Sequence, residues 1–405
     1  MPPSAIAAEP EPLPLAGLLV LELASILAGP TTGQFLAELG ADVIKVENPA
    51  TGGDPTRNWR LASEDPQAAV SAYFCCANWG KQSLALDVAK PAGRQAAVDL
   101  ARRADIVIAS YKPGDDAKLG LDAVTLCTLN PRLIYAQISA YGRHDPRPGF
   151  DAIVQAESGF THLNGAAGGP AVKMPVALVD LLAAHQLKQA ILLALLARAN
   201  SGLGRHVHVS LLEAAVASLA NQASNYLVAG VVPQRMGSEH PNIVPYGSIF
   251  RLGDGRELVL AIGTERQWLN LTDALQRADL AADPRFADNG ARVRHRDQLN
   301  EQLAHALARC DASAIGARLQ AAGVPFGFVN DMQQVWQQPA AQRVLLHHPE
   351  LSGVRSFVAE GVPGAASLSP PPRYNAHGRA VLQDRLGYGA AELQTLVDQG
   401  AWPGD

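Results

Sequence analysis

The sequence predicts an α/β protein, with a doubly wound parallel sheet in a large domain and with a smaller α+β domain. The first observation is that short apolar runs alternate with helical patterns from residue 18 to residue 210. The second is the length of 405 residues, which is too great for one small core. The third is a change near Tyr226, after which turn signals and helices replace the regular alternation.

The large domain begins with a strand–helix–strand unit. Residues 18–23 (LLVLEL) form an apolar run of strand length, a helix follows the turn at Ala28-Gly29-Pro30, and residues 42–47 (DVIKVE) form the second strand. The expected elements that follow are a strand at 83–86, a helix at 92–103, a strand at 105–110, a short helix around Ala123 and a strand at 133–139. Strands joined by helices in this way lie parallel in one sheet.

Asp180 is a lone carboxylate in an apolar stretch that runs directly into a helical pattern. Leucine, isoleucine and alanine recur at helical spacing over residues 181–199, before Asn200 and Gly202 end the pattern. Asp180 is therefore expected to be the N-cap of this helix, because aspartate oxygens accept the free amide hydrogen bonds of a first turn. A carboxylate that the positive end of a helix keeps ionised is also a usable nucleophile. These two interpretations are compatible.

The rest of the chain completes both domains. A strand at 205–210 and an alanine-rich helix at 211–220 end the first run, a hairpin is expected at Asp254-Gly255, and helices extend from Gln267 to about Ala322. The last helix, 390–399, returns to the large domain. The predicted divisions are a flexible leader at 1–16, a large domain at 17–225, a small α+β domain at 226–330 and a return segment at 331–405.

Composition excludes several classes of partner. A net charge of −5 and a pI near 6.1 give no general attraction to nucleic acid or anionic lipid. The four cysteines have neither the spacing of a zinc site nor the density of a secreted disulfide scaffold, which favours the cytoplasm. The apolar stretch at 176–198 contains Asp180, His185 and Lys188, so a buried soluble helix is expected there and not a membrane span.

Common catalytic motifs are missing from the sequence. No G-x-G-x-x-G follows the first strand, and there is no Walker A lysine motif, no H-E-x-x-H and no G-x-S-x-G. Dinucleotide, ATP-dependent, zincin and serine-hydrolase functions therefore lose support. His206 and His208 share one face of a predicted strand without a third ligand nearby, so a polar strand face is favoured over a metal site.

Two basic clusters follow predicted strands. Arg57 and Arg60 come after the Gly52-Gly53-Asp54 loop, and Lys112 and Lys118 come after the strand at 105–110. Both lie beyond the carboxyl ends of strands, where open α/β sheets bind ligands. Solvated surface charge is the alternative interpretation for each cluster.

Taken together, several segments resemble the family III CoA-transferases, which include formyl-CoA and carnitine CoA-transferases and have the α-methylacyl-CoA racemases as relatives. Order, spacing and length agree over nearly the whole chain. The segments that carry the resemblance are residues 18–47, 52–57, 78–88, 110–121, 204–214, 284–299, 323–335 and 376–397. The resemblance implies a Rossmann-like, CoA-binding large domain and a homodimer whose two chains are interlocked.

The resemblance also assigns site residues. Asp180 stands where the family has its nucleophilic aspartate, and Asp151, otherwise a turn residue by its local sequence, stands at the family's preceding acidic position. The expected contacts to CoA are Ala28, Leu86, Ser110, Tyr111, Lys118 and Arg57. Three positions depart from the family pattern, which predicts altered adenine or phosphate contacts to CoA: Asn48, Ser110 and Trp79.

The implied function is transfer of CoA from an acyl-CoA thioester to a carboxylic acid, through acyl-aspartyl anhydride and aspartyl-CoA thioester intermediates, with CoA as co-substrate and no metal. The racemases carry a proton-transferring histidine where this chain has Phe150, which cannot move a proton. A racemase-like epimerase is the alternative, and a non-catalytic CoA-binding protein is a third possibility. The glycine loop of formyl-CoA transferase has no counterpart here, which disfavours oxalate and formate and leaves small dicarboxylates and branched or aromatic acids open.

Overall fold

The computed structural model describes residues 12–405, which form two compact units. The first unit comprises the described residues up to Ser158 together with Met174–Ala223 and Arg343–Asp405, and the second comprises Gly159–Lys173 and Ser224–Gln342. The predicted large domain had included residues 159–173, and the predicted return segment had begun at residue 331. Most of the predicted leader at 1–16 lies outside the described residues.

A six-stranded parallel sheet forms the centre of the first unit, in the order β3-β2-β1-β4-β5-β6. This confirms the α/β fold with a doubly wound parallel sheet. The strands are β1 (Leu19–Leu23), β2 (Asp42–Glu47), β3 (Lys81–Ala85), β4 (Ile106–Ala109), β5 (Ile134–Ser139) and β6 (Arg205–Ser210). The chain builds the sheet from β1 toward one edge and then returns through β4 toward the other, so the order reverses between β1 and β4.

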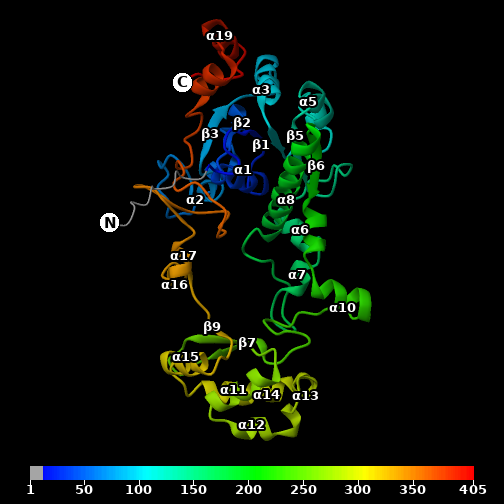
Figure 1. Cartoon of the computed structure of the whole chain (residues 1–405), viewed down its shortest axis with the longest axis vertical. Helices are drawn as coiled ribbons and strands as arrows, with labels where there is room; N and C mark the ends of the chain where they lie inside the picture. Colours follow the sequence, from blue (N-terminus) through cyan, green and yellow to red (C-terminus); the bar gives the residue numbers. More distant parts are fainter. Residues whose placement is uncertain (1–11) are drawn as a thin grey trace, which may run out of the picture. The chain divides into compact units, whose positions relative to one another are not determined.

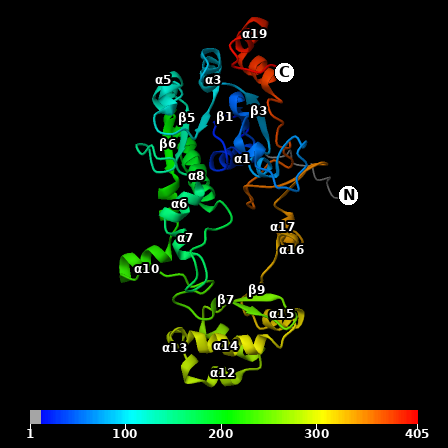
Figure 2. The same cartoon turned by 180° about the vertical axis from the view of Figure 1, so that it is seen from behind.

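Helices cover both faces of this sheet, and its strands β1, β4 and β5 are buried over almost their whole length, whereas the edge strand β6 is buried only at its last two residues. On one face α1 (Ala28–Glu38) contacts α8 (Leu178–Ser201), and α8 also contacts β5 and β6. On the other, α3 (Pro91–Arg103), α5 (Ala123–Leu129) and α19 (Ala390–Asp398) share one apolar core with the sheet. Figure 1 and the reverse view in Figure 2 both place α19 beside α3.

Helix α8 is long and apolar enough to cross a membrane by length and composition alone. It packs against the sheet and against α1, as expected from the sequence, and its buried residues include Lys188 and Arg198. The shorter helices and turns of the first unit and of its boundary are α2 (Ala72–Cys75), α4 (Asp115–Lys118), α6 (Asp151–Glu157), α9 (Leu211–Ala217), α10 (Asn221–Ala229), α18 (Gly378–Ala380), the 3-10 turns Pro49–Thr51 and Pro55–Asn58 and the π-turn Val381–Arg385. A two-stranded hairpin pairs β10 (Leu345–His347) with β11 (Ser352–Val354).

The second unit is a small α+β structure around its own apolar core. Its antiparallel sheet consists of β7 (Tyr246–Arg251), β8 (Glu257–Ala261) and β9 (Phe326–Phe328). The hairpin expected at Asp254-Gly255 joins β7 to β8, and Gly255 has the positive φ of 87° that such a turn favours. The helices are α7 (Phe160–Leu163), α11 (Glu265–Ala274), α12 (Ala278–Ala282), α13 (Asn289–Arg294), α14 (Arg296–Leu307), α15 (Ala312–Ala321), α16 (Met332–Val335) and α17 (Pro339–Gln342), with a 3-10 turn at Pro284–Phe286.

Candidate active site

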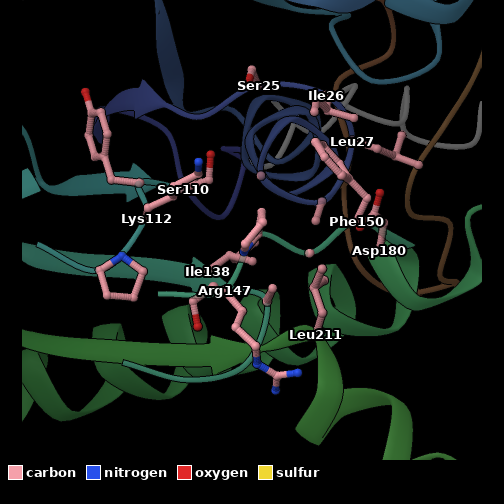
Figure 3. Close-up of a pocket in the computed structure, with 18 of the residues that line it drawn as sticks. Ser25, Ile26, Leu27, Ser110, Lys112, Ile138, Arg147, Phe150, Asp180 and Leu211 are labelled. Atoms are coloured by element: carbon pink, nitrogen blue, oxygen red, sulfur yellow. The ribbon is translucent and has the colours of Figure 1, made fainter. Parts of the chain in front are cut away.

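A pocket of about 260 Å³ opens at the carboxyl ends of β1, β4 and β5, where the strand order of the large sheet reverses. Three loops line it, at residues 25–29, 110–113 and 138–150, together with Asp180 at the start of α8 and Leu211 at the start of α9. Figure 3 shows Leu27, Phe150 and Asp180 on one side of the pocket, and Ser110 and Lys112 on the other.

Asp180 lies in the first turn of α8 and is buried. The prediction that it is the N-cap is wrong: the helix begins at Leu178, its N-cap is Ala177, and no side chain of that residue caps it. Burial, and next the charge of Asp151, raise the pKa of Asp180 to about 7. The sequence predicted a carboxylate that the helix keeps ionised, whereas burial and the charge of Asp151 both favour its protonated form.

Asp151 is the first residue of α6 and provides the cap that Asp180 does not. Its Oδ1 accepts a hydrogen bond of 2.8 Å from the backbone N–H of Val179, in the first turn of α8. Its Oδ2 accepts a hydrogen bond of 2.7 Å from Gln155, whose own Oε1 accepts the N–H of Met174. Asp151 thus fixes the start of the helix that carries Asp180.

The structure brings three of the predicted CoA contacts into the pocket with Asp180, namely Ala28, Ser110 and Tyr111. Ser110 and Tyr111 also line a second pocket of about 360 Å³, in which Leu86 forms part of the wall. The two pockets thus share the loop that follows β4 and the turn at Ser25. Contact of these residues with CoA stays a prediction.

Arg57 and Lys118, the two predicted cationic contacts, line neither pocket. The guanidinium of Arg57 is buried, donates twice to Glu47 over 2.7 Å and stacks on Phe74. Lys118 is exposed and pairs with Asp115 at 2.7 Å. Neither cation lies at a pocket wall, where it could meet a phosphate directly.

The departures from the family pattern also have structural roles. Asn48 caps a 3-10 turn through a hydrogen bond from the N–H of Ala50, and Trp79 is fully buried in the core. His206 and His208 hydrogen-bond Gln137 and Ser139 from their strand, which agrees with the polar strand face expected from the sequence. Within residues 12–405 no group of three or more His, Cys, Asp or Glu side chains is placed to hold a metal.

Sequence reasoning missed several residues at the site. Arg147 lines the pocket, where it pairs with Asp145 at 2.9 Å and stacks on Tyr141. Tyr73, in α2, lies close enough to Asp180 for the charges to interact: burial first, and then neighbouring charges including that of Asp180, raise the pKa of Tyr73 to about 12. No local motif marks either residue, because both reach the site from loops and short helices whose course the sequence pattern does not predict.

Fold and site together define an α/β enzyme with a ligand pocket at the switch point of a parallel sheet and a buried aspartate in its wall. The chain belongs to the CoA-transferase family III, which it matches over residues 15–377, and it is a CoA-transferase that uses CoA as co-substrate. This confirms the resemblance that the sequence motifs indicated.

Relatives of known name cover almost the whole chain. It is 37% identical to a succinate–glutarate CoA-transferase of Agrobacterium fabrum, over 95% of this chain and 96% of that one. It is 31% identical to the succinyl-CoA:glutarate CoA-transferase of Mus musculus, over 96% of this chain and 90% of the mouse protein. The crystal structure of a CAIB/BAIF family protein from Brucella suis superposes with a TM-score of 0.81 at 36% identity, over 92% of this chain and all of that chain.

Proposed function

We propose that Asp180 is the nucleophile of CoA transfer and is acylated during each turnover. One observation carries this proposal: of the two carboxylates that line the pocket, Asp145 is paired with Arg147, whereas Asp180 is buried and has no ion-pair partner within the described part of the chain. A buried, unpaired carboxylate with a raised pKa is a common sign of a functional group. It is half ionised near neutral pH, where it can act as a nucleophile.

The proposed reaction conserves the energy of the thioester. The Asp180 carboxylate attacks the carbonyl carbon of the donor acyl-CoA, forming an acyl-aspartyl anhydride and releasing the CoA thiolate. The thiolate attacks the aspartyl carbonyl, which releases the donor acid and leaves an aspartyl-CoA thioester. The acceptor carboxylate attacks this thioester, and the thiolate released then takes the new acyl group from the second anhydride. Asp180 returns as a free carboxylate, so neither ATP nor an added oxidant is needed.

The start of α1 offers donors for the oxyanions of these steps. Ala28 and Gly29 line the pocket with Asp180, and the N-cap residue Leu27 supplies no side-chain hydrogen bond to them. The first N–H groups of a helix lack partners within the helix and favour negative charge. We propose that these two amides stabilise the tetrahedral intermediates.

For substrates we propose a succinyl-CoA donor and a small dicarboxylate acceptor such as glutarate, because several relatives carry these compounds in their names. Both acids are small enough for a pocket of about 260 Å³. The exposed Lys112, which lines the pocket at the side away from Asp180 in Figure 3, is a candidate partner for the distal carboxylate. That oxalate and formate are poor substrates stays a prediction.

The test is to locate the covalent intermediate. The protein is incubated with succinyl-CoA without an acceptor acid, quenched and digested, and the peptide that contains Asp180 is examined by mass spectrometry. A CoA or succinyl adduct on Asp180 is expected. The Asp180→Asn variant, which keeps the shape of the side chain, should form no adduct and should lose at least about 1,000-fold in kcat. Wild-type turnover by this variant would reject the assignment.

The racemase alternative finds no support at Phe150, which lines the pocket where a proton-transferring base would stand. It is tested by incubating the protein with 2-methylacyl-CoA in deuterated water without any acceptor. A transferase leaves the α-carbon unlabelled, whereas an epimerase exchanges its proton. A protein that only binds CoA would neither label the substrate nor exchange CoA with any acid.

We also propose that the protein is a homodimer. Helix α8 exposes an apolar face that includes Leu193 at 66% and Leu196 at 64% of their full surface, and such faces commonly lie at interfaces. Replacing both leucines with glutamate should shift the sedimentation equilibrium toward monomer. Leu61→Glu, at an equally exposed leucine outside α8, is the matched control. The interlocked arrangement and the cytoplasmic location stay predictions from the sequence.

A further inference from the structure

A buried ion pair holds the turn that joins β1 to α1. Lys45 Nζ lies 2.8 Å from Asp54 Oδ2, and both side chains are fully buried. The same ammonium donates a hydrogen bond of 2.8 Å to the carbonyl of Ala24 and also pairs with Glu22. The Asp54 carboxylate accepts the N–H of Ile26, at 3.2 Å from Oδ2 and 3.3 Å from Oδ1. The pair therefore holds one carbonyl and one N–H of the same short turn.

The residue that Asp54 holds has an unfavourable backbone conformation. Ile26 has a φ of 74°, in the left-handed region, which a β-branched side chain rarely adopts. The other non-glycine residues with positive φ in residues 12–405 are Ala220, Gln276 and Asn375, and none of them is β-branched. Such a conformation persists only where the surroundings impose it, and such residues gather at functional sites. Ile26 lines the pocket of Asp180.

Asp54 is itself held in place by hydrogen bonds with Thr56 and Glu47. Its Oδ1 accepts hydrogen bonds from the N–H and the hydroxyl of Thr56, at 3.0 and 2.8 Å. Its own N–H donates to Glu47 over 2.9 Å, and Glu47 is clamped by Arg57. These contacts give the Gly52–Arg57 segment, which belongs to the family resemblance, a structural role. Arg57 holds Glu47 in place, and Glu47 in turn accepts the N–H of Asp54.

The turn is also in direct contact with the start of α1. A Cβ atom on Gly29 would lie 2.4 Å from the Cβ of Ala24, so only glycine allows the helix to pack this closely on the turn. A displacement of the turn would therefore move Ala28 and Gly29, the first residues of α1, which line the same pocket as Asp180.

We infer that Asp54 is a positioning residue for CoA transfer: by holding Ile26 in its left-handed conformation, it sets the start of α1 relative to Asp180. The inference rests on the proposed function of Asp180. Asp54 and Lys45 lie in the wall of the second pocket, but their side chains expose no surface, so Asp54 acts through the turn that it holds.

The first test compares Asp54→Ala with Asp54→Asn in the full-length protein, using succinyl-CoA and glutarate. The alanine variant should lose about 100-fold in kcat, because small misplacements of reacting groups cost this much. The KM values for both substrates should stay within about twofold, since no substrate contact is removed. The asparagine variant retains an acceptor for the Ile26 N–H and should lose less, about tenfold. Rates are divided by the fraction of protein that forms the covalent adduct, so that unfolded protein does not count.

The second test is a rescue within the Asp54→Ala background. Glycine adopts positive φ without strain, so adding Ile26→Gly should recover about tenfold in kcat. Ile26→Val keeps the β-branch and should recover nothing. If Asp54 affected only global stability, Ile26→Gly and Ile26→Val would change kcat equally in the Asp54→Ala background. Equal kcat values for these two double variants would overturn the inference.

Hydrogen exchange provides a readout that does not depend on catalysis. In Asp54→Ala the amides of residues 24–29 should exchange faster than in the wild type, while the strands of the large sheet keep their protection. Unchanged exchange in the turn, or uniformly faster exchange over the whole first unit, would reject the inference. If the alanine variant does not fold, the same measurement on Asp54→Asn decides. Wild-type activity of Asp180→Asn would reject the proposed nucleophile instead, and the exchange result would still show whether Asp54 holds the turn.

Discussion

Asp151 accepts a hydrogen bond of 2.8 Å from the backbone N–H of Val179 and so caps a helix that begins far along the chain from it. The capped helix is α8, and Asp180 is the residue directly after Val179. Because Asp151 satisfies the amide of the first turn, the carboxylate of Asp180 is not needed as a cap and lines the pocket instead. Capping, which the sequence placed on Asp180, thus belongs to Asp151, and the carboxylate of the proposed nucleophile Asp180 is left for the pocket.

Replacing Asp151 with alanine should destabilise the protein by about 1–2 kcal/mol, because a helix cap and a buried hydrogen bond to Gln155 are both lost. Asp151→Asn keeps an oxygen for the Val179 N–H and should cost less. Urea unfolding measures both, with the exposed Asp384→Ala as control. Equal losses for alanine and asparagine would show that charge, and not capping, determines the effect.

In the pH profile of kcat/KM, the acid limb should have an apparent pKa near 7. The proposed nucleophile, Asp180, must be ionised to react, and its pKa is raised to about 7. Burial is the larger cause, and the charge of Asp151 is the second. Asp151→Asn removes the second cause, so the acid limb should move to lower pH and the relative rate at pH 6 should increase. Rates at several pH values from 5 to 9 test this; an acid limb that does not move would separate Asp151 from the titration of Asp180.

Much of the fold follows from local sequence, whereas parts of the site do not. The parallel sheet, the pocket at the strand ends and the place of Asp180 were predictable, because apolar periodicity and strand–helix alternation are local signals. The cap of α8 was not predictable, since the side chain that provides it comes 28 residues before Val179. Arg57 likewise reads as a surface cation until the fold brings Glu47 beside it and buries both.

The stability of the protein should reveal the cost of a charged Asp180. Its pKa is raised from the ordinary value of 3.8 to about 7, so the folded state binds the proton more tightly than the unfolded state does. This group therefore favours folding at low pH, and its contribution is lost as pH rises from about 4 to about 7. Asp180→Asn should be more stable than the wild type at pH 8 by roughly 2–4 kcal/mol, and the difference should vanish near pH 4. A difference that does not depend on pH would contradict the raised pKa.

Gly33 lies where helix α1 packs directly against the buried ion pair of Glu22 and Lys81. A Cβ atom on Gly33 would lie 1.9 Å from Oε2 of Glu22, an oxygen that pairs with Lys81 at 2.8 Å. On an exposed helix, glycine to alanine stabilises by about 1 kcal/mol. Here the methyl group must displace a fully buried carboxylate from its partner, so Gly33→Ala should destabilise by at least about 2 kcal/mol.

Urea unfolding of Gly33→Ala measures this loss, and Gly327→Ala is the matched control, because a Cβ atom there meets nothing within 4 Å. The control should change stability by less than about 0.5 kcal/mol. Since Glu22 also pairs with Lys45, which holds Asp54, Gly33→Ala should lower kcat as well as stability, whereas Gly327→Ala should change neither. An increase in the stability of Gly33→Ala would mean that helix propensity outweighs the packing against Glu22, and that these buried charges tolerate displacement.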